Sequence, residues 1–161
     1  MKRLIYETEL TDIPRHYDGL VAFKIEFSTP KEQFLRGKSQ FGSFFAYHGS
    51  KLENFHSIIH RGLISDLNER RLYGFGTYLT LKYSTAMGFA AKSARWHHSR
   101  LFSHPYLSCI AIVEVVDDPS IIYSETPKWN VDIREHRKNC YCLVVNRDEL
   151  MQLRYLFVFN T

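Results

Sequence analysis

The sequence predicts an α+β fold in which strands outnumber helices. Several short segments have the apolar pattern of strands, and two segments with helical periodicity follow two of them. The 161 residues are 45% hydrophobic and 15% aromatic, which is typical of a chain that folds around a core of its own. Because the chain also lacks repeats and low-complexity segments, we expect one domain over residues 1–161.

The first strand and the first helix are predicted near the N-terminus. Apolar residues alternate over 23–27, which is the pattern of a half-buried strand, and Pro30 follows its end. Residues 29–34 read as the start of a helix, because Pro30 stands near its first position.

A second strand and a second helix follow. The aromatic segment 41–47 predicts a strand that delivers His48 at its end. Ser50 and Glu53 have the spacing of a capping box, so we expect a helix to begin at Ser50 and to stop at Gly62. The apolar face of this helix consists of Leu52, Phe55, Ile58, Ile59 and Leu63.

The middle of the chain predicts one more strand and one more helix. A strand around Leu79 is entered through Gly74 and Gly76. A helix is expected from Ser84 toward Trp96, because this stretch is rich in alanine.

Three further strands are expected at 107–116, 141–145 and 155–159, the first of them buried. A short helical or turn segment at 148–150 separates the last two. Residues 123–138 form the longest stretch without a pattern, and we expect a loop there at the rim of a functional site.

The charge of the chain indicates which kinds of partner it favours. The formal net charge is +4, and most of the basic residues are dispersed. A diffuse positive surface favours contact with anions, such as the pyrophosphate of a dinucleotide, an acidic protein or RNA. Nucleic-acid binding rests on this charge alone, because no aromatic residues are interleaved with basic ones on a strand platform.

Cysteine usage and hydropathy predict a cytoplasmic protein. Cys140 and Cys142 would point in parallel from one strand and bridge poorly, so we expect reduced thiols. We find no signal peptide, and the longest apolar stretch, 107–116, is too short to cross a bilayer and contains Glu114. We therefore expect no membrane segment in this chain.

Three segments carry the chemistry, and they are Tyr47-His48-Gly49-Ser50, Gly74-Phe75-Gly76-Thr77-Tyr78-Leu79-Thr80 and Arg154-Tyr155-Leu156-Phe157-Val158-Phe159. With these motifs the chain resembles the ADP-ribosyltransferase catalytic domain of the PARP, or diphtheria-toxin-like, family. The run 47–63 is similar in particular to the family's tail-anchored branch of the endoplasmic reticulum. The resemblance covers 23–161 and leaves 1–20 as an N-terminal extension. It implies two apposed, largely antiparallel sheets around an NAD cleft, with flanking helices.

The resemblance implies a set of NAD contacts in the first motif. His48 would hydrogen-bond the hydroxyl of the adenosine-side ribose. Gly49 would pair its backbone N–H and C=O with the nicotinamide carboxamide, which a side chain would obstruct. Ser50 and Asn54 would support the ribose contacts, and Ser50 could cap a helix as well.

The other two motifs complete the implied site. Tyr78 would stack on the nicotinamide ring, and Phe89 on the following helix would cover its other side. Ala86 stands where many members of the family place a serine against the carboxamide, so one polar contact is lost. Tyr155 occupies the third catalytic position, beside His48 and Tyr78, where polymer-forming members carry glutamate.

These residues imply that the protein is an enzyme with NAD as its substrate. A phenol ionises only near pH 10 in water, so Tyr155 cannot serve as the base that extends a polymer. We therefore expect a mono-ADP-ribosyltransferase that transfers one ADP-ribose to a protein acceptor, which could be the chain itself. The alternative is a degenerate NAD or ADP-ribose-binding module, for which Ala86 and Tyr155 are the warning signs.

Other kinds of site are disfavoured. His56 and His60 have the i, i+4 spacing of zinc ligands, but no glutamate follows His56, and we expect no metal. The segment 74–76 lacks the third glycine of a Rossmann fingerprint, and no Gly-x-Ser-x-Gly motif of a hydrolase is present. The remaining candidate ligands, expected to be surface histidines, are His97, His98 and His104.

Overall fold

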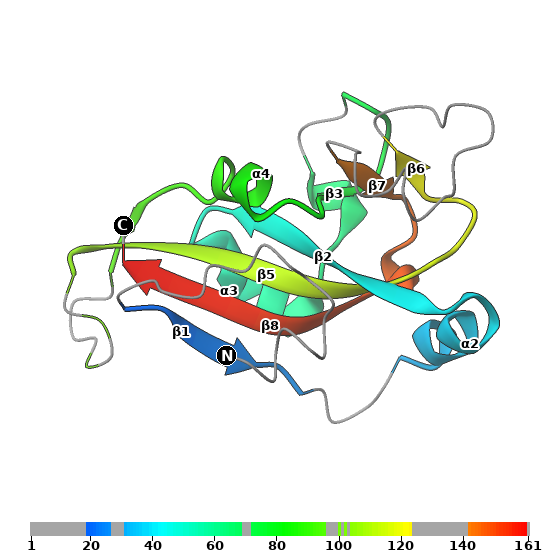
Figure 1. The fold of residues 1–161 in the computed structure, drawn as a ribbon, viewed down its shortest axis with the longest axis horizontal. Coiled ribbons are helices and arrows are strands. Elements are labelled where there is room, and N and C mark those ends of the chain that lie inside the picture. Colours follow the sequence, from blue (N-terminus) through cyan, green and yellow to red (C-terminus); the bar gives the residue numbers. More distant parts are fainter. Residues whose placement is uncertain are drawn as a thin grey trace.

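An α+β fold is formed by the residues that the computed structural model describes, which are 19–26, 31–68, 72–95, 100, 102, 104–123 and 142–160 (Figure 1). Among them, one antiparallel sheet has the strand order β1-β8-β5-β2 with β4 paired to β5, and a second has the order β3-β7-β6. The predicted fold class is confirmed. The strands are β1 (Val21–Lys24), β2 (Ser43–Ser50), β3 (Thr77–Leu79), β4 (Ser93–Ala94), β5 (Tyr106–Val116), β6 (Ile122–Tyr123), β7 (Leu143–Val145) and β8 (Met151–Asn160). The helices are α2 (Glu32–Phe41), α3 (Asn54–Arg61) and α4 (Tyr83–Met87), with 3-10 turns η1 (Ser65–Leu67) and η2 (Asp148–Leu150).

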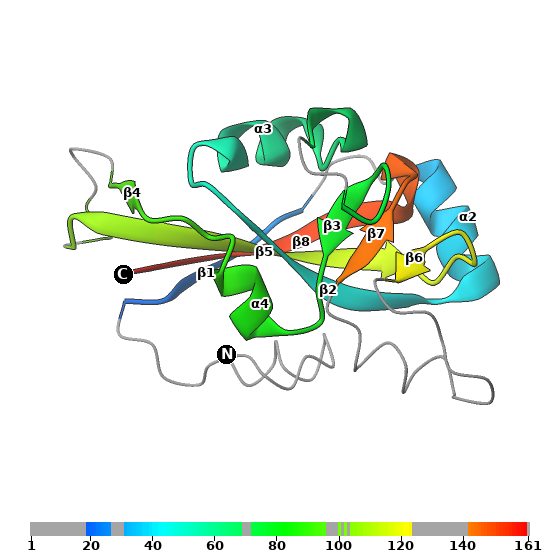
Figure 2. The same cartoon turned by 90° about the horizontal axis from the view of Figure 1, so that it is seen from above.

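Strand β5 is the centre of the larger sheet and is buried along almost its whole length. It pairs with β2 on one side and with β8 on the other. Helix α3 lies on one face of this sheet and α4 on the other (Figure 2). Because both faces are covered, β5 need not alternate between apolar and polar residues, which accounts for the continuous apolar run in the sequence.

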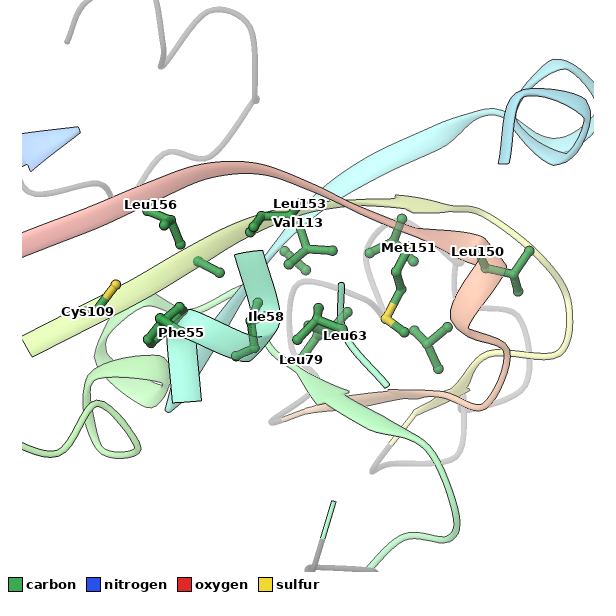
Figure 3. Close-up of a cluster of buried hydrophobic side chains, with 14 of the residues drawn as sticks. Phe55, Ile58, Leu63, Leu79, Cys109, Val113, Leu150, Met151, Leu153 and Leu156 are labelled. Atoms are coloured by element: carbon green, nitrogen blue, oxygen red, sulfur yellow. The ribbon is translucent and has the colours of Figure 1, made fainter. Parts of the chain in front are cut away.

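The larger part of the core lies between α3 and the sheet. Figure 3 shows Phe55 and Ile58 of α3 among side chains of β5 and β8, including Val113 and Leu156. Burying one side chain of this size stabilises the fold by about 1.5–3 kcal/mol. This packing holds α3 directly after the end of β2.

A second cluster of buried side chains lies on the α4 face. Tyr47 of β2 and Tyr83 of α4 meet edge to face, with ring centroids 5.8 Å apart and an interplanar angle of 77°. The other buried members are Ala86, Ala90, Ile110, Ile112, Tyr155, Phe157 and Phe159. The cluster fastens the short helix α4 to β2.

The two sheets are joined beside the first motif. The backbone N–H of Tyr47 donates to the oxygen of Thr80 over 2.7 Å, and the N–H of Thr80 donates to the oxygen of Tyr47 over 3.0 Å. This bridge lies just beyond β3, so it places β3 next to the free edge of β2.

The predicted boundary between the first helix and the second strand is wrong. Phe41, expected to open a strand, is the last residue of α2, and Gly42 with φ +78° ends the helix. The strand then begins at Ser43 and continues past His48 to Ser50. Aromatic residues favour strands, but a glycine with positive φ stops a helix wherever it stands.

The predicted capping box is also absent. Ser50 is held in extended conformation by its pairing with Cys109, and α3 begins only at Asn54. The Ser50 hydroxyl accepts a hydrogen bond from the Asn54 side chain over 2.9 Å. The Glu53 carboxylate accepts one from Ser93 over 3.1 Å instead of capping the helix. The predicted stop at Gly62 is confirmed, since its N–H bonds to the oxygen of Ile58.

The helix expected from Ser84 toward Trp96 is much shorter. It spans Tyr83–Met87, and the chain turns at Gly88 before residues 93–94 pair with β5 as β4. The Ser108 hydroxyl donates to the oxygen of Ala90 over 3.0 Å and holds the turned chain against β5. Pairing with the sheet therefore outweighs the helix propensity of the alanines.

The remaining expectations are partly met, and the first strand, expected over 23–27, is β1 at Val21–Lys24. Strand β5 and η2 match 107–116 and 148–150 closely, and β8 extends the predicted 155–159 by four residues toward the N-terminus and one toward the C-terminus. Tyr123, placed in a loop, belongs to β6. Residues 124–141, which include most of that predicted loop, lie outside the described part of the chain, as do Trp96, His97 and His98.

A buried ionic cluster joins α2 to three strands. Glu114 of β5 is only 3% exposed, and one carboxylate oxygen accepts hydrogen bonds from Lys38 over 2.6 Å and Ser43 over 2.7 Å. The other accepts one from Arg154 over 2.7 Å. Burial alone would raise the pKa of Glu114, but these three hydrogen bonds outweigh it and lower the pKa below its usual value.

Within the described residues, no helix combines the length and the apolar character that crossing a bilayer requires. Cys109 and Cys142 are both buried, and Cys140 lies outside the described part. Burial raises the pKa of Cys109 to about 12, so this thiol stays protonated at neutral pH.

Candidate active site

The candidate site lies where the end of β2 meets β3 and the turn that follows α4. Strand β2 carries His48, Gly49 and Ser50 along the edge of the larger sheet, where among the described strands they pair only with β5. Strand β3 carries Tyr78. The fold thus brings together two motifs that are thirty residues apart in the sequence.

His48 is oriented by the backbone of β3. Its Nδ1 lies 3.0 Å from the carbonyl oxygen of Tyr78. Because a carbonyl oxygen can only accept, the proton of the neutral ring must be on Nδ1, and Nε2 is left as an acceptor. Burial lowers the pKa of His48, and the hydrogen bond to Tyr78 offsets this only in part. The ring is therefore neutral at neutral pH.

Gly49 lies close to the backbone of the α4 region. A Cβ at this position would overlap the carbonyl oxygen of Ala86 and lie 3.2 Å from the Cβ of Phe89. The predicted residues Gly49, Ala86 and Phe89 are therefore neighbours in the structure. The need for glycine here is one of space.

The backbone of Gly49 is directed toward the free edge of the sheet. The N–H and C=O of a strand residue point to the same side, and this side alternates from one residue to the next. Tyr47 points both groups away from β5, toward Thr80. Gly49, two residues later, must also direct its N–H and C=O away from β5.

Phe89 was expected on a helix, but the structure places it outside one. It follows α4 in a turn, where its N–H donates to the oxygen of Ala86 over 3.0 Å. Phe89 is 42% exposed as a residue, whereas Ala86 is fully buried. Phe89 therefore lies at the surface beside the edge of β2 and not in the core.

Tyr78 is engaged at both of its polar ends. Its carbonyl oxygen meets His48, as described above. Its hydroxyl accepts a hydrogen bond from the N–H of Tyr73 over 2.8 Å and donates one to the oxygen of Gly74 over 2.9 Å. Sequence reasoning assigned a role to the ring and missed these hydroxyl contacts, for which the sequence holds no signal.

Ser50 and Asn54 lie at the outer end of the site. Their side chains are joined by the hydrogen bond of 2.9 Å, and Asn54 is exposed. Both residues follow His48 and Gly49 closely in the sequence. The Asn54 amide and the Ser50 hydroxyl are the polar groups at this end of the site.

Tyr155 sits deeper than the other predicted residues. It is 7% exposed and belongs to the buried cluster on the α4 face. In the sheet it pairs with Ile112, which in turn pairs with Tyr47, whereas His48 pairs with Ala111 on the next rung. Side chains alternate between faces from one rung to the next, so Tyr155 shares a face with Tyr47 and Gly49 rather than with His48.

No cluster of three or more potential metal ligands occurs in the part of the chain that the structure describes. His56 and His60 are exposed on α3 with ring centroids 4.7 Å apart, and His104 is an exposed residue whose ring contacts the backbone of Tyr106. Two imidazoles do not complete a structural zinc site.

Comparison with known proteins identifies the family of this chain. A family model described as the poly(ADP-ribose) polymerase catalytic domain matches residues 6–150. Protein mono-ADP-ribosyltransferase PARP16 is 36% identical over 149 residues in both Homo sapiens and Mus musculus, covering 86% of this chain and 46% of each relative. Protein mono-ADP-ribosyltransferase PARP8 of Mus musculus is 29% identical over 135 residues, covering 66% of this chain and 16% of the relative. This chain spans less than half the length of these relatives. It belongs to the family of poly(ADP-ribose) polymerase catalytic domains.

Proposed function

We propose that this chain is an NAD-dependent mono-ADP-ribosyltransferase. The observation that carries the proposal is the edge of β2 at Gly49, which directs an N–H donor and a C=O acceptor away from β5. A primary carboxamide presents one acceptor and two donors, so it can pair with both groups at once. Family membership makes the carboxamide of nicotinamide the ligand of choice.

The neighbouring residues fit the rest of the substrate. Phe89 and the ring of Tyr78 would be the stacking partners for nicotinamide. The unprotonated Nε2 of His48 is suited to accept a hydrogen bond from a ribose hydroxyl. Ser50 and Asn54 would add polar contacts to the same ribose.

These residues would act by position and not by proton transfer. The bond between nicotinamide and ribose breaks with its electron pair leaving on nicotinamide, which departs as a neutral molecule. The anomeric carbon of the ribose takes on cationic character, and an acceptor nucleophile forms the new bond there. Holding the carboxamide and the ribose hydroxyls rigidly favours this step, because the reacting groups lose less freedom in the transition state.

We propose that the product is a single ADP-ribose unit. PARP16 and PARP8 are both named as mono-ADP-ribosyltransferases. Tyr155 replaces the glutamate of polymer-forming members, and a buried phenol is unsuited to activate the end of a growing chain. A protein acceptor, including the chain itself, and a cytoplasmic location belong to the same proposal, as does a single catalytic domain over 1–161.

Labelled NAD tests the proposal directly. The purified chain and its His48→Ala variant are incubated with NAD labelled in the adenylate part, and protein-bound label and free nicotinamide are measured. We expect both to appear with the wild type, in single-unit adducts by mass spectrometry, and to fall strongly with the variant. Ladders of poly-ADP-ribose would contradict the assignment of a single-unit product.

The second candidate is a module that binds NAD or ADP-ribose without turnover. It is favoured by Ala86, which removes a polar contact, and by the burial of Tyr155. Isothermal titration that detects NAD binding, together with no release of nicotinamide in the presence of several acceptors, would support this module over the enzyme.

Two substitutions at Tyr155 distinguish a role of this residue in turnover from a role in packing. Tyr155→Phe keeps the ring in the buried cluster and should lower turnover about twofold to tenfold, the value of one hydrogen bond. Tyr155→Ala should lower turnover further and also reduce the free energy of unfolding by about 3–5 kcal/mol, because it leaves a cavity. Turnover is therefore compared at a temperature where urea titration shows both variants folded. Equal turnover in all three chains would exclude a role for Tyr155.

A further inference from the structure

The segment 72–76 is tied to the candidate site by one hydroxyl group. Tyr78 on β3 accepts the N–H of Tyr73 over 2.8 Å and donates to the oxygen of Gly74 over 2.9 Å. One side chain therefore bonds to the backbone of two consecutive residues in the segment that leads into its own strand.

The apolar side chains of this segment do not anchor it by burial. Leu72 is 80% exposed, Tyr73 is 37% exposed and Phe75 is 41% exposed. Segments with little buried apolar surface open at low free energy, so their hydrogen bonds decide how much of the time they are closed.

The C-terminal end of the segment is held by backbone packing at Gly76. Gly76 has φ +147°, and a Cβ there would lie 2.6 Å from the carbonyl oxygen of Val145 in β7. Its backbone thus packs against the neighbouring strand. The hydroxyl of Tyr78 acts further up the segment, at Tyr73 and Gly74.

The same residue orients His48 through its main chain. The carbonyl oxygen of Tyr78 receives Nδ1–H of His48 over 3.0 Å. We propose that Tyr78 is a two-ended positioning residue, whose carbonyl orients His48 and whose hydroxyl holds the segment 72–76 closed beside the site that binds NAD. We call the two hydrogen bonds from the Tyr78 hydroxyl to Tyr73 and Gly74 the latch. The part of this inference that concerns NAD rests on the function proposed above, whereas the latch itself does not.

The latch predicts that the ring and the hydroxyl of Tyr78 have separable effects. Tyr78→Phe keeps the ring and the carbonyl group but removes both hydrogen bonds to the segment. Loss of two neutral hydrogen bonds should raise the population of the open segment about fivefold to a hundredfold. The orientation of His48 should not change, because its partner is the backbone.

Amide hydrogen exchange followed by NMR measures this without NAD. The amide of Tyr73 should exchange at least about fivefold faster in Tyr78→Phe than in the wild type. The amides of the paired strands β2 and β5 serve as an internal reference for general destabilisation and should keep their rates. Tyr106→Phe is the matched control, because Tyr106 is 52% exposed at the start of β5, away from the segment. Equal exchange of the Tyr73 amide in wild type and Tyr78→Phe would overturn the latch.

The ¹⁵N shifts of the His48 ring test the other end. They should report a proton on Nδ1 in both the wild type and Tyr78→Phe. A change of tautomer in Tyr78→Phe would show that the two ends are not separable and would overturn the two-ended assignment.

Titration with NAD then tests the link to the site. The dissociation constant and KM for NAD should rise about fivefold or more in Tyr78→Phe, with a smaller change in kcat, because the closed segment contributes to binding. Faster exchange at Tyr73 without a change in NAD affinity would overturn the part that concerns NAD and leave the latch standing. A wild type that binds no NAD would instead refute the proposed function, while the exchange result would still decide on the latch.

Discussion

The Nδ1 atom of His48 donates to the Tyr78 carbonyl oxygen, 3.0 Å away, and this leaves Nε2 as the ring nitrogen that can meet a ligand. Two substitutions at His48 distinguish the contact of Nδ1 from the contact of Nε2. An asparagine amide can take the place of Nδ1–H and has no counterpart of Nε2, whereas alanine loses both. The pair therefore distinguishes the ligand contact from the structural one.

We expect His48→Asn and His48→Ala to weaken NAD binding to a similar extent, by about 1–3 kcal/mol, because both lose the acceptor for the ribose hydroxyl. His48→Asn should keep more of the free energy of unfolding than His48→Ala. Isothermal titration with NAD and urea denaturation measure the two effects. Unchanged NAD affinity in both variants would show that this histidine does not contact the ribose.

The lowered pKa of His48 also makes stability depend on pH. The unfolded chain takes up a proton at this residue near pH 6.5, whereas the folded chain resists it because partial burial disfavours the charged ring. The free energy of unfolding should therefore decrease as the pH falls below about 6.5. We expect a smaller decrease between pH 7 and pH 5.5 in His48→Asn, measured by urea denaturation. Glu114 does not interfere, since its lowered pKa places its titration at more acidic pH. The same slope in both chains would contradict the assignment.

At the scale of elements, a continuous apolar run is read from the sequence more reliably than helix propensity. The apolar run of β5 is buried on both faces and was predicted almost to the residue. The alanine-rich stretch after Ser84 was predicted as a long helix, but contacts distant in sequence decide its course, among them the bond from Ser108 to Ala90. Local propensity cannot reveal such contacts. The same limit explains the misplaced start of α3, where strand pairing at Ser50 outweighs a capping pattern.

The candidate site was predictable to the extent that its motifs are contiguous. His48, Gly49 and Tyr78 were assigned from their motifs, and the structure brings them together. The depth of Tyr155 and the partners of the Tyr78 hydroxyl depend on sheet register and on a loop conformation. Neither can be derived from residue types and spacing.

The close approach of β2 to the α4 region predicts a sharp difference between two glycines. Gly49→Ala forces a methyl group against the carbonyl oxygen of Ala86, and we expect it to lower the free energy of unfolding by about 1–3 kcal/mol. Gly88 ends the same helix at φ −61°, a conformation that alanine adopts, and its added methyl would lie 3.3 Å from the oxygen of Thr85. Gly88→Ala should therefore change stability by less than about 1 kcal/mol. Urea denaturation of both variants is the measurement, and equal effects would contradict the packing argument.

At the scale of the whole molecule, the site at one end of β2 and the ionic cluster at the other share the same strands. Ser43 opens β2 and bonds to Glu114, while His48 and Gly49 lie five and six residues later at the edge that faces β3. Strand β5 spans both. This arrangement separates a region that stabilises the sheet from a region that is open to a ligand.

The cluster around Glu114 should stabilise the fold without taking part in catalysis. Glu114→Gln removes the charge that Lys38 and Arg154 share. Removing one partner of a buried ion pair usually lowers the free energy of unfolding of a protein by about 3–5 kcal/mol. We expect a smaller loss here, about 2–3 kcal/mol, because the side chains of Lys38 and Arg154 are 45% and 31% exposed and can still reach water. NAD affinity should be unchanged at a temperature where the variant is folded.

The matched control is the exposed pair of Glu32 and Arg36 on α2, whose side chains are 79% and 76% exposed. Glu32→Gln removes the same kind of charge, but an i, i+4 pair on a helix surface contributes only about 0.3–0.5 kcal/mol. The difference between the two variants should shrink below about pH 4.5, because acid neutralises Glu114 in the wild type once the pH falls through its lowered pKa. Urea denaturation of both variants at pH 7 and pH 3.5 measures this. Equal losses at pH 7 would show that burial does not strengthen the contribution of Glu114, and the cluster would then be only a set of surface contacts.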